Sequence, residues 1–324
     1  MKWHERGFQR SQKETEQLVS IALGECPVYD QVMNLFIDNA AVPFLCVAAV
    51  CSCCTADDFV RVAVVEDKRI SESSGLAISH ANPNAIWIHN DSGDKPRLFL
   101  VGLDGVTQAV VEIAGADAHD WEDLCSFKIN GESWLLIGDV GDNLTRRGNG
   151  HPACRLYLLK EPVVPAARRP AKIQWNVSAT ITFAYENGPA NCEGVAVDVE
   201  REEILLLTKS LPHKCELYRL PLNTRAGRQK TVAKRIADVF IPFATALDIS
   251  PDGRTMVVCT MLNGLSVTRV SDRTWTDALG KPGTAFNLPP RKQGETICFD
   301  TTGRWLYVNS EGSRQPLWRM NTPK

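Results

Sequence analysis

Five stretches of this chain open alike, with SSGLAIS (73–79), WEDLCSF (121–127), CEGVAVD (192–198), ATALDIS (244–250) and GETICFD (294–300). Each opening is followed by short runs of β-branched and aromatic residues with turn sequences such as Pro251-Asp252-Gly253 between them, which is typical of β-strands. No amphipathic helix of ordinary length accompanies these runs. A similar unit recurring along an all-β chain predicts a β-propeller.

The strand count predicts the number of blades and how the ring closes. The first four stretches each hold four strand candidates, with the outer strands of the second and third expected at 175–185 and 231–239. The last stretch holds only three. An unassigned strand, FVRVAVV at 59–65, would complete the last sheet and remove two unprotected edges. We therefore expect an all-β, five-bladed β-propeller over residues 59–324, closed by its N-terminal strand; a six-bladed propeller with one degenerate blade and a β-sandwich are the alternatives.

Residues 1–58 form a prefix of different character. The uncharged stretch AAVPFLCVAAVCSCC (40–54) is too short to span a bilayer comfortably, and it fits the apolar part of a signal segment at about 33–54. The sequence around Cys51 loosely matches a bacterial lipoprotein cleavage site, although Asp38 stands where a positive flank is usual. We expect a secreted or cell-envelope protein, with membrane anchoring only through N-terminal lipidation; the alternative is an apolar segment docked on the domain.

Composition excludes two classes of function. The formal net charge is −2, so the chain has no basic footprint for a phosphate backbone, and nucleic acid is not an expected partner. None of the six cysteines after residue 58 shows the paired CxxC spacing of a zinc site.

One polar residue of each opening falls at the same repeat position, at the mouth of the central channel. Like charges about 4 Å apart repel by roughly 4 kcal/mol per pair at a partly screened dielectric, so converging glutamates need a counter-charge. A hard divalent cation supplies it, and roughly six to eight oxygen ligands suit Ca²⁺ better than Mg²⁺ or Zn²⁺. The alternative is a set of unrelated polar residues facing a wet channel. The predicted metal ligands are Ser74, Glu122, Glu193, Thr245 and Glu295.

The second strands return to the same face, so their ends should surround this ring. Asp91 follows Ser74 by the same 17 residues by which Asp139 follows Glu122. We expect Asp91 or Asp139 to act as the catalytic base. Turn chemistry alone is the other reading of these Asn-, Asp- and Gly-rich loops. The amide, carboxylate and cationic groups expected to bind substrate are Asn90, Asp142, Arg146, Arg147 and Lys209.

The ring pattern Ser, Glu, Glu, Thr, Glu resembles that of the calcium-activated nucleotidases (apyrases), which carry Ser, Glu, Glu, Ser, Glu around a central calcium on a five-bladed propeller. The opening ESSG at Glu72 and the pair Asn90-Asp91 also resemble apyrase segments. The resemblance implies a calcium-holding ring and a rim that binds a nucleotide's phosphates. Two departures leave nucleotide specificity open: no arginine stands at Ser92-Gly93, and Thr245 replaces a serine.

A looser similarity links the acidic loops DWED (120–123) and GDVGDN (138–143) to secreted bacterial phytase-like propellers. If the protein is an enzyme, we expect calcium-dependent hydrolysis of a phosphate ester or anhydride. The alternatives are a non-catalytic surface or binding propeller with structural calcium, and a glycoside hydrolase that uses the channel carboxylates. The expected partner is a small phosphorylated molecule or a carbohydrate.

Overall fold

The computed structural model describes residues 59–323, apart from 149, 166–169 and 210–214. The predicted signal and lipidation segment at about 33–54 lies outside these residues. None of the helices within the described ranges has the length and apolar character needed to cross a bilayer.

The described part of the chain is built from β-strands, with one short helix, α3 (Trp275–Leu279), which Thr274 caps at its N-terminus. In chain order the strands are β1 (Phe59–Val64), β2 (Ser73–Ile78), β3 (Ala85–Asn90), β4 (Arg97–Gly102), β5 (Thr107–Ala114), β6 (Trp121–Ile129), β7 (Glu132–Asp139), β8 (Cys154–Lys160), β9 (Ala171–Asn176), β10 (Ala179–Tyr185), β11 (Cys192–Asp198), β12 (Glu203–Thr208), β13 (Cys215–Pro221), β14 (Gly227–Val239), β15 (Ala244–Ile249), β16 (Thr255–Thr260), β17 (Gly264–Thr268), β18 (Thr284–Phe286), β19 (Thr296–Phe299), β20 (Trp305–Asn309) and β21 (Pro316–Asn321).

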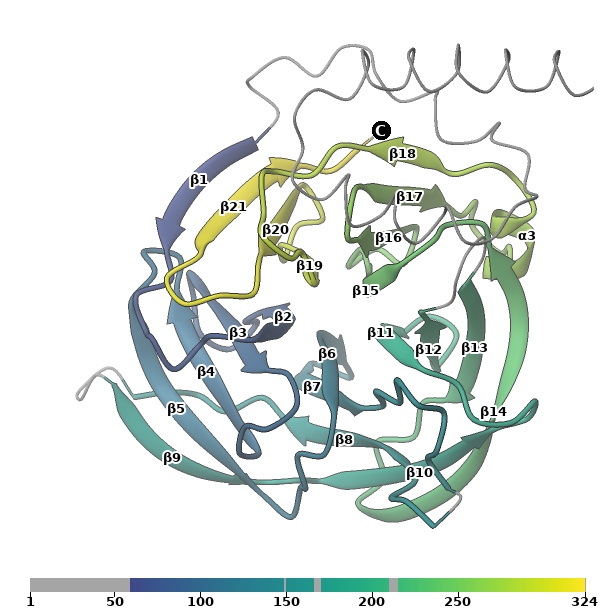
Figure 1. Cartoon of the computed structure of the whole chain (residues 1–324), viewed down its shortest axis with the longest axis horizontal. Coiled ribbons are helices and arrows are strands. Elements are labelled where there is room, and N and C mark those ends of the chain that lie inside the picture. The colour runs from purple at the N-terminus through teal and green to yellow at the C-terminus, as the bar shows by residue number, and fades with distance from the viewer. Residues whose placement is uncertain (1–58, 149, 166–169, 210–214, 324) are drawn as a thin grey trace, which may run out of the picture. The chain divides into compact units, whose positions relative to one another are not determined.

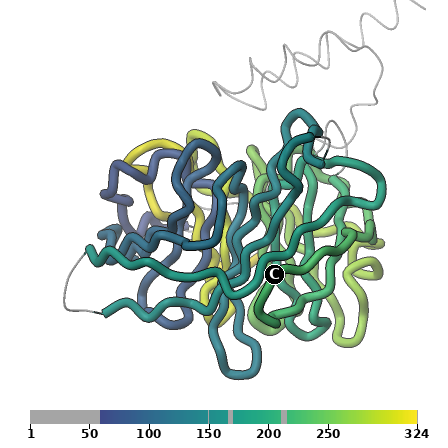
Figure 2. The backbone as a smooth tube through the Cα atoms, turned by 90° about the horizontal axis from the view of Figure 1, so that it is seen from below, coloured from purple at the N-terminus to yellow at the C-terminus, as the bar shows by residue number. Residues whose placement is uncertain are grey.

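The strands form sheets around a central axis (Figure 1). Three sheets have the orders β2-β3-β4-β5-β9, β15-β16-β17-β18 and β1-β21-β20-β19, and an eight-stranded sheet runs β11-β12-β13-β14-β10-β8-β7-β6. The first strands β2, β6, β11, β15 and β19 neighbour one another in a closed ring about the axis. In the side view, much of the backbone runs up and down, while teal segments cross the front of the molecule (Figure 2). The arrangement is propeller-like and all-β, as the sequence predicts.

The predicted N-terminal closing strand is present. β1 pairs antiparallel with β21, from Phe59 opposite Met320 to Val64 opposite Pro316. The first and last described strands thus share one sheet, and β21 has a partner on each side because β20 covers its other edge. Pairing removes the unsatisfied N–H and C=O groups that an exposed edge strand would present.

The outer strands differ from the prediction. The single strand expected at 175–185 is two strands: β9 pairs parallel with β5, whereas β10 pairs antiparallel with β8. The strand expected at 231–239 starts at Gly227, and its first half pairs parallel with β10 before its second half pairs with β13. The pairing of β9 with β5 covers the outer edge of the first sheet, and the pairing of β10 with β14 fuses two runs of four strands into the eight-stranded sheet.

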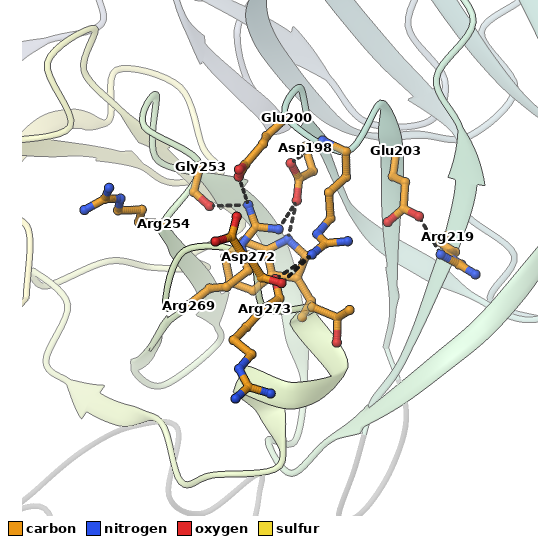
Figure 3. A network of polar contacts seen from close by, with 12 residues as sticks. Asp198, Glu200, Glu203, Arg219, Gly253, Arg254, Arg269, Asp272 and Arg273 are labelled. Carbon is orange, nitrogen blue, oxygen red and sulfur yellow. Dashed lines mark hydrogen bonds and ion pairs between the residues drawn. The ribbon is translucent and has the colours of Figure 1, made fainter.

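A buried ionic contact joins the end of β11 to the segment around β17 and α3. The guanidinium of Arg269, only 3% exposed, lies 2.7 Å from Asp198 Oδ2 and 2.9 Å from Glu200 Oε2, and donates to the Gly253 carbonyl at 2.7 Å (Figure 3). It also stacks over the Trp275 ring at 4.6 Å, while Trp275 Nε1 donates to Asp198 Oδ2 at 2.8 Å. These contacts therefore join two sheets, and the charge of Arg269 is compensated by Asp198 and Glu200.

Two carboxylates satisfy backbone N–H groups on the inner strands. Asp123 Oδ2 accepts from Val195 N at 2.8 Å and from Leu247 N at 3.2 Å, so one side chain links β6, β11 and β15. Asp248 accepts from Phe299 N of β19 at 2.8 Å and from Ile249 N at 2.8 Å. Burial raises the pKa of Asp123 well above its usual range and that of Asp248 to about 7.

The pKa of Asp248 predicts a stability that falls as the pH rises. Between about pH 4 and pH 7 the folded protein keeps the Asp248 proton while the unfolded chain releases it, so the free energy of unfolding decreases through this window. Asp248→Asn mimics the protonated carboxyl. Urea denaturation in the presence of chelator measures the free energy of unfolding. The value for the variant minus that for the wild type should increase from pH 4 to pH 8. A constant difference between the two proteins across this range would contradict the prediction.

Candidate metal centre

A β-bulge marks the predicted ring position in four of the five inner strands. The register of β2 with β3 skips Ser74, and the corresponding pairings skip Glu122, Glu193 and Thr245 in the same way. Glu295 directly precedes β19. Because a bulge leaves one residue unpaired and redirects its side chain, the same local irregularity presents each of these residues at the start of an inner strand.

The two hydroxyls of the ring link neighbouring inner strands. The Ser74 hydroxyl donates to the Glu122 carbonyl, and the Thr245 hydroxyl donates to the Gly294 carbonyl at 3.0 Å. Both residues are 1% exposed. Their protons are therefore used between strands, and the negative charge of the ring comes from its three glutamates.

Glu122 is a buried carboxylate to which no described residue donates a hydrogen bond. It is 3% exposed. Burial raises its pKa well above its usual range, and the charges of Glu193, Asp91, Asp120 and Glu295 raise it further. A largely buried carboxylate without a protein donor or an opposite charge is costly in its ionised form. A proton or a cation would relieve this cost.

Glu193 has protein partners that Glu122 lacks. Lys209 Nζ lies 3.1 Å from Glu193 Oε2, and Asn191 Nδ2 donates to Oε1 at 2.8 Å. Burial raises the pKa of Glu193 to about 7, and the adjacent Lys209 limits the rise. The predicted substrate-binding lysine is therefore engaged with a predicted metal ligand.

Asp91 lies between two groups of carboxylates. Ligand atoms of Asp91, Glu295 and Glu311 lie within 4.8 Å of one another, and so do those of Asp91, Asp120 and Glu122. Burial, opposed by the Ser92 N–H and reinforced by nearby carboxylates, raises the pKa of Asp91 to about 6. Burial and the neighbouring Glu295 raise the pKa of Glu311 to about 8. Such crowding of oxygen ligands is what a hard divalent cation relieves.

The other predicted rim residues hold the loops around these carboxylates. Asp139 is fully buried, its Oδ1 lies 2.7 Å from Arg147 Nη2, and it also accepts from Asp120 N at 3.0 Å. Asp142 accepts from the backbone N–H groups of Arg146 and Arg147 at 2.7 and 2.9 Å. Asp139, Asp142 and Arg147 therefore shape the loop after β7, whereas the Arg146 side chain is exposed.

Asn90 performs a similar task beside Asp91. Its side-chain oxygen accepts from Ser71 N at 3.1 Å and Glu72 N at 3.2 Å, and its amide donates to Arg69 O and Asp94 Oδ2, both at 2.7 Å. These bonds use the donors and acceptors of the Asn90 amide. They fix the segment before β2 and the loop after β3. The structure thus brings Asp91, Glu122 and Glu295 together and gives Asn90 internal partners.

The sequence placed Glu311 at the bend equivalent to that of Lys209, and Asp120 and Gly141 in acidic loops, but did not identify any of the three as a metal-site residue. Glu311 follows Glu295 by the same 16 residues by which Lys209 follows Glu193, and Asp120 stands two residues before Glu122, so repeat alignment carried a signal for both. At Gly141 an added Cβ would lie 2.1 Å from Glu122 Oε1 and 2.6 Å from Asp120 Oδ2. Only glycine lets this loop approach the carboxylates so closely.

No family model matches this sequence, and neither does any curated protein. Similarity to solved structures is limited, as three of them illustrate. A gluconolactonase from Xanthomonas campestris is 12% identical, with 79% of this chain and 88% of that chain covered and a TM-score of 0.44. A PQQ-bound aldose sugar dehydrogenase from Streptomyces coelicolor is 10% identical over 81% and 97%, with a TM-score of 0.42. A chain of a nidogen/laminin complex is 10% identical over 74% and 72%, with a TM-score of 0.41.

Similarity at this level does not identify an activity. None of these three structures is described as a calcium-activated nucleotidase or a phytase. The resemblance to those families therefore remains a prediction from the sequence, and the chemistry of the site has to be argued from its own residues.

Proposed function

We propose that this domain is an exported, calcium-binding, five-bladed β-propeller that hydrolyses a small phosphate ester or anhydride. The blade count treats β6, β7, β8 and β10 as one blade and β11–β14 as another, although parallel pairing of β10 with β14 joins them. Export rests on the apolar stretch at 40–54. The observation that carries the metal centre is Glu122, which is 3% exposed and has no hydrogen-bond donor among the described residues.

The residues present suit a hard cation. Carboxylate oxygens are the preferred ligands of Ca²⁺, and flexible sites with roughly six to eight oxygens favour Ca²⁺ over the strictly octahedral Mg²⁺. The hydroxyl oxygens of Ser74 and Thr245 are at the same repeat position as the glutamates. The carboxylates that would hold the cation are Asp91, Asp120, Glu122, Glu295 and Glu311.

A bound divalent cation would polarise a phosphoryl oxygen and make a coordinated water more acidic. Asp91 is the catalytic residue in this proposal, because it is partly exposed and is the one member common to both carboxylate groups. Its carboxylate holds the reactive water in place and accepts its proton. Lys209 and the exposed Arg146 offset charge on the phosphate. Asp139, Asn90, Asp142 and Arg147 act as positioning residues.

Calcium should stabilise the wild-type domain much more than it stabilises Glu122→Gln. At about 100 times its Kd a ligand adds roughly 2.7 kcal/mol to the free energy of unfolding. Chemical denaturation with calcium or with chelator measures this gain. Glu122→Gln should lose most of it while its metal-free stability stays equal or rises, because a repelling charge is gone. Glu132→Gln removes an exposed carboxylate that pairs with Lys160 and should keep the full gain. A full gain in Glu122→Gln would refute the centre.

A panel of phosphate esters, nucleotides and glycosides assayed with and without chelator then separates the functions. Phosphate release that depends on calcium supports the proposed hydrolase. Calcium stabilisation with no turnover of any substrate would favour a binding propeller with structural calcium. Glycoside cleavage that survives chelator would favour a glycosidase that uses the channel carboxylates as acid and base.

A further inference from the structure

We infer that the centre holds two divalent cations bridged by Asp91, an inference that rests on the proposed function. The ligand atoms fall into two groups of three rather than one group of five. Asp120 and Glu122 belong to the first group, Glu295 and Glu311 belong to the second, and Asp91 belongs to both.

The five carboxylates as placed do not form one compact group. Calcium binds oxygens at about 2.3–2.6 Å, so two ligands of one ion lie at most about 5 Å apart. Within each group the ligand atoms lie within 4.8 Å of one another, but the two groups do not merge under the same limit. Two neighbouring positions with a shared carboxylate satisfy this geometry, and paired metal ions in hydrolases typically stand roughly 3.5–4 Å apart.

The charge of the cluster supports the same conclusion. The five carboxylates carry a formal charge of −5 when ionised, of which one divalent cation leaves −3 and two leave −1. Lys209 lies 3.1 Å from Glu193 and also interacts with Glu295 and Glu122. Counting Lys209 together with Glu193, which belongs to neither group, leaves the formal charge at −5. The unpartnered Glu122 carboxylate, 3% exposed, points to a ligand at the first position independently of the number of acidic residues.

The two positions are alike in burial. Each combines one buried carboxylate, Glu122 or Glu295, with two partly exposed ones, and Asp91 is one of the two partly exposed carboxylates in both. A phosphate oxygen of the substrate can therefore enter from the side of Asp91, which belongs to both positions.

Calcium binding to the full chain, stripped of metal, tests the inference by isothermal titration and by metal analysis after dialysis. We expect two calcium ions per wild-type chain and one in Glu311→Gln. Glu122→Gln should also bind one, and Asp91→Ala should weaken both. Glu132→Gln, matched in chemistry but exposed and paired with Lys160, should still bind two. Circular dichroism of each metal-free variant confirms that it is folded.

The possible outcomes separate the two proposals. One calcium ion per wild-type chain would overturn the two-cation inference and leave the proposed function standing. No calcium binding at all would overturn the proposed function as well. Two ions in both the wild type and Glu311→Gln would overturn the assignment of the second position to Glu295 and Glu311.

Discussion

Replacing Asp91 by asparagine is expected to lower calcium-dependent hydrolysis of a phosphate ester by roughly 10²–10⁴-fold, the usual range for losing a positioned proton-transfer group. The amide has nearly the shape of the carboxylate but lacks its charge and its basicity. It therefore neither holds the reactive water against the cation nor accepts its proton.

Separate measurement of kcat and KM over a range of calcium concentrations distinguishes catalysis from metal binding. If Asp91 only contributed affinity for calcium, saturating calcium would restore kcat. We expect kcat to stay low. The matched control is Asp104→Asn, an exposed aspartate in the turn between β4 and β5 that accepts from Val106 N at 3.1 Å. A loss of less than about tenfold in Asp91→Asn would remove Asp91 from the mechanism.

Arg269→Met should destabilise the domain by about 3–5 kcal/mol, because removing one member of a buried ion pair leaves the other charge uncompensated. The Arg269 side chain is 3% exposed and that of Asp198 is fully buried. The substitution also removes the contact with Glu200, the bond to the Gly253 carbonyl and the stacking on Trp275. Guanidinium denaturation measures the loss.

Arg219→Met is the matched control, because it breaks an arginine–glutamate pair at the surface nearby. Arg219 is 51% exposed and lies 2.5 Å from Glu203, and Figure 3 shows the pair apart from Arg269. Exposed pairs contribute about 0–1 kcal/mol. Combining Arg269→Met with Asp198→Leu should recover part of the loss, because no buried charge is then unpaired. Equal losses in the two arginine variants would show that burial of Arg269 adds nothing.

The sequence was sufficient for the inner strands and insufficient for the outer ones. Openings such as SSGLAIS and CEGVAVD are apolar, similar and bounded by turns, so both their strand identity and their alignment are local properties. The position of the break between β9 and β10 is not determined by the local sequence. Val177 N donates to Ala114 O of one sheet and Ser178 N to Leu158 O of the next, so the chain changes partner between adjacent residues. Only tertiary structure decides that change.

Some features of the candidate site could be predicted from the sequence and others could not. Repeat alignment located Glu122 and Glu295, because both stand at the same position of the repeated opening. It did not reveal that Lys209 lies on Glu193 or that Arg147 turns inward to Asp139, because both depend on which loops pack together. Charge type can be read from a sequence, but burial and pairing of a charge cannot.

Pairing of β1 with β21 brings an early and a late segment of the propeller into one sheet. The proposed cation centre spans a similar interval, because Asp91 follows β3 whereas Glu295 and Glu311 flank β19 and β20. During synthesis Asp91 emerges long before Glu295 and Glu311, so the proposed centre would lack two of its carboxylates until β19 and β20 have been made.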